Sequence, residues 1–159
     1  MKALLDELLA LDLLTLRDPV SGGALEPDAQ RLRLQQTLTC CSCLAVRRAG
    51  ALVAYATLEP QAEGQAFVRG FSLHPASRNA AVLGELLSQV AAWMGAHGVQ
   101  TLHSHVLKGN AASLALHRKL GFAVQQENER ALAFSADRAA LLAHPAVRRA
   151  ALRAAELGA

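Results

Sequence analysis

Hydrophobic positions near the start of the chain recur at helical spacing and then give way to loop residues. Leucines over residues 1–16 fall on one face of a helix, and polar or charged residues fall between them. The Asp-Pro and Ser-Gly-Gly of residues 18–23 mark a loop. Glu26 before Pro27 is typical of a helix start, which predicts a second, short helix over about 27–36.

Apolar runs with the shorter period of strands follow. The pattern changes from Thr39 onward, and runs bounded by turn residues predict strands over 42–48, 51–58 and 66–73. Next comes a broad apolar face at helical spacing, which predicts a long helix over about 79–96 that ends before Gly98.

The remaining pattern alternates between strand and helix. It predicts a strand over 100–107, a helix from Asn110 to Gly121 and a hairpin formed by 123–124 and 130–134. A C-terminal helix follows, capped by Asp137 and broken near His144-Pro145. A strand–helix–strand unit with short loops requires a right-handed crossover and two parallel strands, whereas the preceding meander is antiparallel. The expected fold is therefore α/β (α+β) with a mixed sheet, in one domain over residues 1–159 with no repeat or linker.

Composition and charge exclude several classes of protein. No apolar run approaches the roughly 20 residues of a membrane span, and Asp6, Glu7 and Asp12 interrupt the N-terminal run, which lacks a signal-peptide cleavage site. The net charge is only +3, and aromatic residues make up 4% of the chain. A nucleic-acid interface usually concentrates basic and aromatic residues. We interpret the arginines near the C-terminus, including Arg148 and Arg149, as a solvated helix face, and we expect a cytoplasmic protein that binds neither nucleic acid nor membrane.

The three cysteines lie together at Cys40, Cys41 and Cys43. Cys40 and Cys43 form a C-x-x-C pair, but there is no second pair to complete a zinc site. Apolar neighbours predict that the cysteines are small residues on a buried strand, and clustered free thiols fit a reducing compartment.

The most specific segment is Asn110–Phe122, N-A-A-S-L-A-L-H-R-K-L-G-F. Its spacing is that of a helix with Asn110 as N-cap, one face carrying Ser113, Leu116 and His117, and Gly121 at the end. It resembles the motif N-x-x-[AS]-x-x-L-Y-x-K-L-G-F of the GNAT acetyltransferases at every marked position but one, where His117 stands in place of Tyr.

A second segment, residues 71–87, resembles the GNAT phosphate-binding region, an L-x-V-x-P strand followed by [QR]-x-x-G-x-[GA] and a leucine-rich helix. Alignment on Leu86-Leu87 places Arg78 on the Gln/Arg position. Asn79, Ala81 and Leu83 then stand where glycines or small residues are usual.

The resemblance implies a mixed, mostly antiparallel sheet flanked by helices, with one parallel strand pair in the centre. It also implies acetyl-CoA as co-substrate, with its pyrophosphate on backbone amides at a helix N-terminus. The residues carried over to that site are Leu73, Arg78, Asn79, Ala80, Ala81, Val82, Leu83, Gly84, Asn110 and Ser113.

Leu83 is the most serious departure, because its branched side chain must turn away or fill part of the site. A one-residue slip would bring Gly84 into the loop instead, at the cost of the leucine register. We favour weakened or altered coenzyme binding over none.

Catalysis in the family proceeds by direct attack of an amine on the thioester, which implies an oxyanion site near the Leu73 amide and His117 as general acid. The base is not fixed: Glu59 is the nearest carboxylate, and His103 and His105 share one strand face. These histidines also fit packed or partly exposed strand positions, and they lack an evident third ligand for a metal.

The sequence therefore predicts an N-acetyltransferase acting on a small-molecule or peptide amine, an acceptor that residues 1–37 and 123–136 do not identify. The alternative is a non-catalytic GNAT-fold protein that binds another ligand or a partner chain. GNAT-like proteins often dimerise, so the C-terminal helix is also a candidate homodimer surface.

Overall fold

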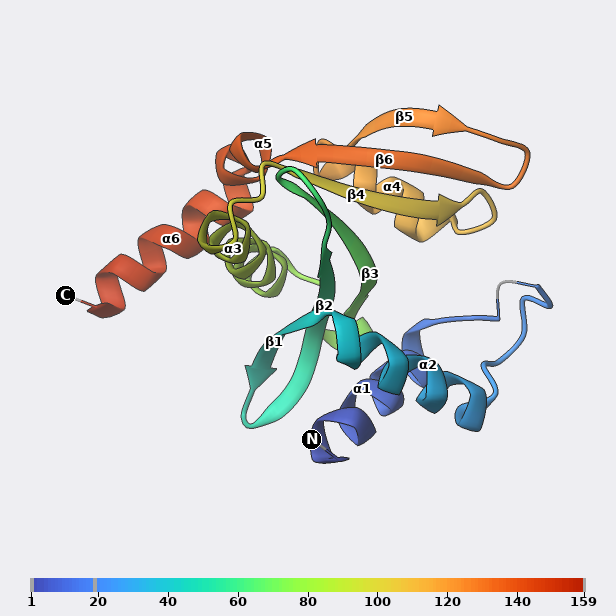
Figure 1. Cartoon of the computed structure of the whole chain (residues 1–159). Coiled ribbons are helices and arrows are strands. Elements are labelled where there is room, and N and C mark those ends of the chain that lie inside the picture. Colours follow the sequence, from blue (N-terminus) through green and yellow to red (C-terminus); the bar gives the residue numbers. More distant parts are fainter. Residues whose placement is uncertain (1, 19, 159) are drawn as a thin grey trace.

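A six-stranded mixed sheet forms the centre of the computed structural model, which describes residues 2–18 and 20–158 (Figure 1). Pro19 of the predicted loop lies outside the described residues. The strand order is β1-β2-β3-β4-β6-β5, and only the central β3–β4 pair is parallel, as predicted. The strands are β1 (Ser42–Arg48), β2 (Ala51–Pro60), β3 (Gln65–Leu73), β4 (Thr101–Leu107), β5 (Ala123–Glu127) and β6 (Ala131–Asp137).

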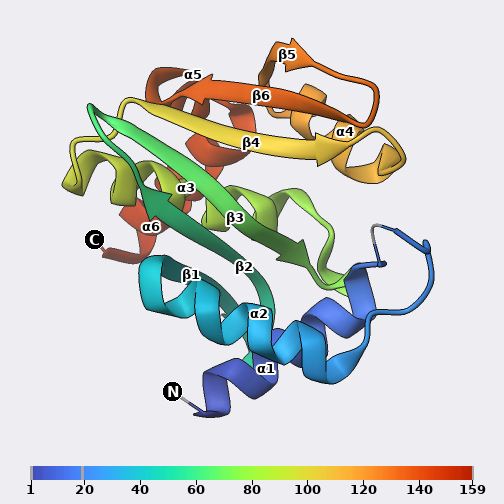
Figure 2. The same cartoon turned by 45° about the vertical axis from the view of Figure 1, so that its right-hand side comes forward.

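Helices cover both faces of the sheet, as Figure 2 shows with the two N-terminal helices in front and α3 and α6 behind. The helix α1 contacts β2 and β3, whereas α3 contacts β1, β2, α5 and α6. The helices are α1 (Lys2–Thr15), α2 (Pro27–Cys40), the short 3-10 helix η1 (Pro75–Ser77), α3 (Ala80–Ala96), α4 (Ala111–Lys119), α5 (Arg138–Ala143) and α6 (Pro145–Gly158). None of these helices is long and apolar enough to cross a membrane.

Two of the three hydrophobic clusters among the described residues lie on opposite faces of the sheet. The larger lies between the sheet and α3, where Leu86 and Met94 are fully buried. The smaller lies on the opposite face, where leucines of α1 pack on Leu52 and Tyr55 of β2. β2 contributes to both clusters because successive side chains of a strand point to opposite faces, and an extra residue at Val53 brings Leu52 to the same face as Tyr55.

The central strands separate soon after they begin. Gln65–Phe67 of β3 pair with Thr101–His103 of β4. Beyond these residues the ribbons of the two strands diverge (Figure 1). The register between β2 and β3 shifts after Val68, so that Arg69 is an extra residue on β3. Such a bulge bends and twists its strand, which turns the end of β3 away from β4 and opens space beside Leu73.

The end of the second helix is the main error of the sequence-based prediction. α2 continues to Cys40 instead of ending near Gln36, whereas the first strand begins at Ser42 as predicted. Cys40 is therefore an exposed helix residue, and Cys43 is half-buried on β1, so the prediction of three cysteines on a buried strand is wrong. The Cys40 thiol donates to backbone carbonyl oxygens in the last turn of α2. A thiol at this position is therefore compatible with the end of a helix.

Asp137 precedes α5 as predicted, but its side chain makes no cap hydrogen bond and instead accepts one from Thr101. The break at His144-Pro145 separates α5 from α6, as predicted.

Candidate functional site

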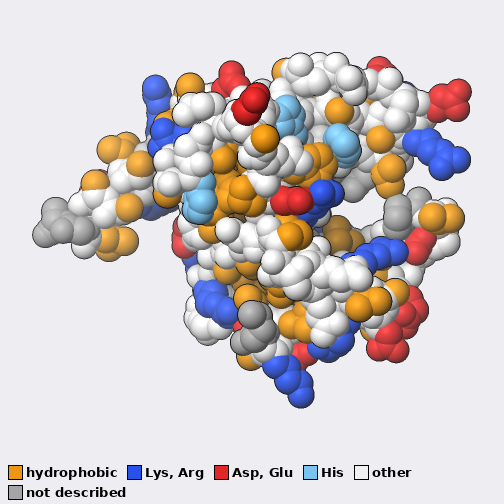
Figure 3. Space-filling model, viewed as in Figure 1, with side chains coloured by type: hydrophobic (Ala, Val, Ile, Leu, Met, Phe, Trp, Pro, Cys, Tyr) orange, Lys and Arg blue, Asp and Glu red, His pale blue; other side chains and the backbone are white. Residues whose placement is uncertain are grey.

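A cavity of about 470 Å³ lies where β3 ends, between the N-terminal ends of α3 and α4. The end of α1 and the start of α6 complete its walls, and the surface in Figure 3 is hollowed between the N-terminal helices and the part formed by β4–β6. The lining residues include seven of the predicted coenzyme-binding residues, Leu73, Arg78, Asn79, Ala80, Leu83, Asn110 and Ser113.

The first turn of α3 offers hydrogen-bond donors to this cavity. Asn79 is the N-cap, and its side-chain oxygen accepts a hydrogen bond from the Val82 amide at 3.0 Å. The amides of Ala80 and Ala81 have no partner within the helix, because the first N–H groups of a helix never do. Together with the helix dipole, these amides favour an anion at this end.

α4 repeats the arrangement on the other side of the cavity. Asn110 is its N-cap and accepts a hydrogen bond from the Ser113 amide at 3.1 Å. The side-chain amide of Asn110 is thereby held at the wall of the cavity, and two helix N-termini converge on one space.

Positive charge dominates the described lining of the cavity. Arg78, Lys119 and Arg149 lie in its wall with His144, and no Asp or Glu is among the residues that line it. Arg78 is tied to the end of β3, since its Nε donates to the Leu73 carbonyl at 3.4 Å. The arrangement suits a polyanionic ligand such as a phosphate chain.

The departures from the GNAT loop have definite places in the structure. Leu83 lines the cavity but is only 7% exposed, and it belongs to the core beneath α3. Val82 is buried in the same core. Gly84 faces Ala146 of α6, where an added Cβ would lie 2.3 Å from the Ala146 carbonyl oxygen. The described lining of the cavity therefore includes none of Ala81, Val82 and Gly84, which were predicted to bind the coenzyme.

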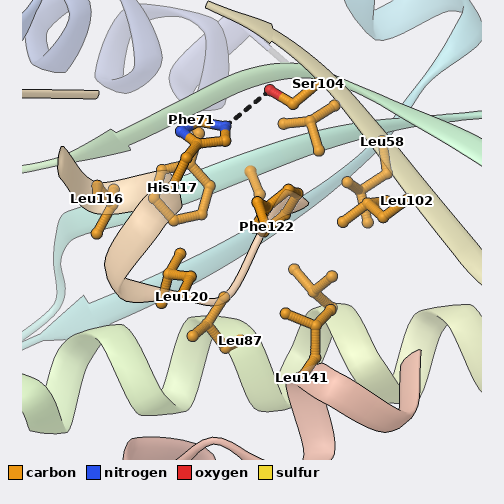
Figure 4. A pocket seen from close by; sticks show the side chains of 13 residues that line it. Leu58, Phe71, Leu87, Leu102, Ser104, Leu116, His117, Leu120, Phe122 and Leu141 are labelled. Carbon is orange, nitrogen blue, oxygen red and sulfur yellow. Dashed lines mark hydrogen bonds between the residues drawn. The ribbon is translucent and has the colours of Figure 1, made fainter. Parts of the chain in front are cut away.

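A second, apolar pocket of about 40 Å³ lies deeper between the sheet, α3 and α4 (Figure 4). Phe71 and Leu116 line both this pocket and the larger cavity, so the two spaces adjoin. Among the described residues that line it, the only polar side chains are His117 and Ser104, which point toward each other in Figure 4.

His117 is held by both ring nitrogens. Nδ1 lies 2.7 Å from the Ser113 carbonyl oxygen and must donate to it, so Nε2 accepts from the Ser104 hydroxyl at 3.0 Å. The rings of Phe122 and Phe134 pack against the imidazole. Burial lowers the pKa of His117, and the neutral ring is favoured at neutral pH.

The three groups predicted as bases lie away from the cavity. His103 and His105 share one strand face, as predicted, but it is the face opposite Ser104, and histidines reach the surface over β4 in Figure 3. His103 contacts Gln65, and His105 packs edge-on against Phe67. Glu59, near the end of β2, forms an ion pair with Arg69 at the bulge of β3.

Glu59 instead lies beside the cysteines. Ligand atoms of Cys40, Cys41 and Glu59 fall within 4.8 Å of one another, a grouping different from the Cys40–Cys43 pair considered from the sequence. Burial and the neighbouring Cys40 thiol raise the pKa of Cys41 to about 12, so this thiol is protonated at neutral pH.

A buried carboxylate next to the cavity escaped the sequence analysis. Asp12 of α1 is completely buried and accepts hydrogen bonds from the Tyr55 hydroxyl at 2.5 Å and Gln30 Nε2 at 2.8 Å. The Ser72 hydroxyl is 3.4 Å from the same Asp12 oxygen as Tyr55, and it contacts the Thr15 hydroxyl at 3.1 Å. Ser72 and Thr15 both line the cavity.

Burial raises the pKa of Asp12, although its three hydrogen bonds act in the opposite direction. The one signal in the sequence was an acidic residue four positions after Leu8, on the apolar face of the first helix.

Known proteins that this chain resembles are acetyltransferases. The family model described as Acetyltransferase (GNAT) family matches residues 7–122, whereas no curated protein matches the chain. Solved structures with the same fold include an N-acetyltransferase, PaiA, from Thermoplasma acidophilum in complex with coenzyme A (14% identity, 84% of this chain and 92% of that chain, TM-score 0.68). The ribosomal-protein-S18-alanine N-acetyltransferase of Escherichia coli is also similar (16% identity, 86% of this chain and 89% of that chain, TM-score 0.66). A third similar structure is a GNAT family acetyltransferase from Elizabethkingia anophelis with acetyl-CoA bound (15% identity, 69% of this chain and 84% of that chain, TM-score 0.59).

Proposed function

Because this chain belongs to the GNAT acetyltransferase family, we propose that it moves an acetyl group from acetyl-CoA to a primary amine by direct attack. The observation that carries the proposal is the cavity at the end of β3, where two helix N-termini and three cationic side chains meet without a carboxylate in the described lining. Coenzyme A presents a pyrophosphate and a further phosphate, which need such a positive, donor-rich wall.

The coenzyme-binding residues divide by role. We propose that the free amides of Ala80 and Ala81 bind the pyrophosphate, with Arg78 as its nearest cation. Asn110 and Ser113 contribute from α4, and the amide near Leu73 supports the acyl carbonyl oxygen. When bound, acetyl-CoA supplies the activated acyl group, and the residues of the chain orient it and exclude water.

Protonation of the departing sulfur is assigned to His117 from its place in the motif. In the resting arrangement its Nε2 accepts from Ser104, so the ring must first take up a proton before it can donate one. Its position beside Phe71 and Leu116, which line both spaces, supports a role at the acyl end of the cavity.

The proposed acceptor is a small-molecule or peptide amine. A second candidate function, binding of a ligand without turnover, is favoured by the missing glycines at Asn79, Ala81 and Leu83. Tight coenzyme binding together with no turnover across a broad panel of primary amines and short peptides would support this second function.

Calorimetric titration with acetyl-CoA tests the proposal directly, and absence of binding at millimolar ligand contradicts it. Lys119 and Arg118 provide a matched pair, because they are adjacent and exposed on α4 but only Lys119 lines the cavity. We expect Arg78→Ala and Lys119→Ala each to weaken acetyl-CoA binding by about 10-fold or more, since a charged hydrogen bond contributes about 1.5–3 kcal/mol. Arg118→Ala should change affinity by less than about 3-fold.

A further inference from the structure

We propose that Asp12, acting through the hydroxyl of Ser72, takes up the proton that the acceptor amine must lose before it attacks. The inference rests on the proposed acetyl transfer and names a positioning residue for it. It concerns the acceptor side of the cavity, which the coenzyme-binding residues leave undefined.

The reaction requires such a proton acceptor. A primary amine is mostly an ammonium ion at neutral pH and then has no lone pair to attack a carbonyl carbon. No carboxylate lines the cavity in the described part of the chain, and Glu59, His103 and His105 lie elsewhere. Asp12 is separated from the wall of the cavity by a single hydroxyl.

The geometry gives the proton a short path. Ser72 precedes Leu73, so its hydroxyl lies next to the backbone where the acyl group is proposed to bind. Ser72 Oγ is 3.4 Å from Asp12 Oδ1 and 3.1 Å from Thr15 Oγ1. The Thr15 hydroxyl donates to the Leu11 carbonyl at 2.9 Å. The Ser72 proton therefore has two acceptors, Thr15 and Asp12, and can turn toward the carboxylate when an ammonium donates to Ser72 Oγ.

The atoms balance without a further reactant. The ammonium gives one proton to Ser72 Oγ as the Ser72 proton passes to Asp12. The freed nitrogen lone pair forms the C–N bond and the C–S bond breaks. The departing sulfur takes a proton from the protonated ring of His117, and the second nitrogen proton replaces the one that His117 loses. Asp12 returns its proton to solvent through Ser72, so the products are an amide, a thiol and one released proton.

The surroundings of Asp12 suit a base rather than a permanent ion pair. The groups that face the carboxylate are Tyr55 from β2, Gln30 from α2 and Ser72 from β3, all uncharged at neutral pH. Burial raises its pKa toward neutrality, where a proton acceptor is most effective. Desolvation also raises the pKa of Tyr55, which keeps the phenol a donor to Asp12.

The test compares the pH dependence of kcat/KM for the wild type, Asp12→Asn and Ser72→Ala, with phenethylamine or dialanine as acceptor, whichever reacts faster. In the wild type, kcat/KM should be level between the pKa of Asp12 and that of the amine. Both variants must use the fraction of free amine, so their kcat/KM at neutral pH should be about 10²-fold lower with phenethylamine and about tenfold lower with dialanine. Below the pKa of the amine, their kcat/KM should rise about tenfold per pH unit. In the free wild-type protein, ¹³C NMR titration of the Asp12 carboxyl should give the same pKa as the acid limb of kcat/KM.

Gln30→Ala is the matched structural control, because it removes a hydrogen bond from the other Asp12 oxygen and leaves the Ser72 path intact. Its kcat/KM should stay level with pH, and its melting temperature should fall. A pH profile of Ser72→Ala equal to that of the wild type overturns the proposal, and it decides alone if Asp12→Asn does not fold. An NMR pKa that differs from the kinetic one also overturns it. Absence of acetyl-CoA binding to the wild type would instead refute the proposed function. It would not bear on Asp12 itself, because Asp12 does not line the cavity.

Discussion

The two nitrogens of His117 have different partners, and this decides what the ring can do at each pH. Nδ1 donates to Ser113 and Nε2 accepts from Ser104, so only the protonated ring carries a proton that it can pass on. Because burial lowers the pKa of His117 from 6.5, that form becomes appreciable only as the pH falls below this value. A general acid role therefore contributes more at low pH.

His117→Ala should consequently lower kcat by about tenfold at neutral pH, below the usual 10²–10⁴ for a general acid, because little of the ring is protonated. We expect the ratio of wild-type to variant kcat to be larger at pH 6 than at pH 8, with acetyl-CoA affinity nearly unchanged. Steady-state kinetics at both pH values measure it. An equal ratio at the two values would leave His117 with a packing role only.

Leu83 stands where the family has a small residue, yet its side chain points mostly into the core. We expect Leu83→Ala to lower the free energy of unfolding by about 2–5 kcal/mol, as for other buried leucines, and to change the dissociation constant of acetyl-CoA by less than about threefold. Urea denaturation and calorimetry measure the two effects. Coenzyme binding more than tenfold tighter would show instead that the leucine obstructs the phosphates.

At the scale of elements, the contact between α3 and α6 depends on one glycine. An added Cβ at Gly84 would lie 2.3 Å from the Ala146 carbonyl oxygen, so the backbones of the two helices must move apart. Gly84→Ala should therefore cost about 1–3 kcal/mol of stability, as overpacking does, despite the better helix propensity of alanine. Thermal denaturation measures it. Gly109→Ala is the control, because an added Cβ there meets nothing within 4 Å, and an equal effect in both variants would contradict the explanation.

Helices and strands could be predicted from the sequence because their signals are local. Asn79 and Asn110 cap the helices that they were expected to begin, and the single parallel pair followed from one crossover. The end of α2 was not predictable in this way, since the apolar residues before Ser42 fit a helix and a strand equally well.

The site likewise could be predicted only where its signals are local in the sequence. The motif located the coenzyme side, whereas the acceptor side depends on contacts between distant segments that no local pattern encodes. Asp12, for example, meets Tyr55 and Ser72 across 43 and 60 residues.

At the scale of the whole molecule, the cavity is assembled from segments that are far apart along the chain. Thr15 of α1, Ser72 of β3, Asn110 before α4 and Arg149 of α6 all line it. The last of these lies beyond residue 122, where the family match ends. We therefore propose that residues 1–159 act as one domain, with α6 as part of the binding site and not an appendage.

Two truncations test whether the first part of α6, rather than its exposed second part, belongs to the binding site. Ala146 and Val147 are buried against α3, and Ala146 and Arg149 line the cavity, whereas Leu152 and Leu157 are exposed. Removal of residues 151–159 should leave stability and acetyl-CoA affinity nearly unchanged. Removal of residues 145–159 should lower stability by about 3 kcal/mol or more through lost apolar burial, and should weaken acetyl-CoA binding by about 10-fold or more.

Arg149→Ala in the full chain separates charge from packing, because it removes the guanidinium and leaves Ala146 and Val147 in place. If α6 contributes mainly charge, this variant should reproduce the weaker binding of the longer truncation without its loss of stability. Calorimetry and thermal denaturation of the three variants measure both quantities. Wild-type affinity after removal of residues 145–159 would show that the site is complete without α6, and the domain that binds the coenzyme would then end before Pro145.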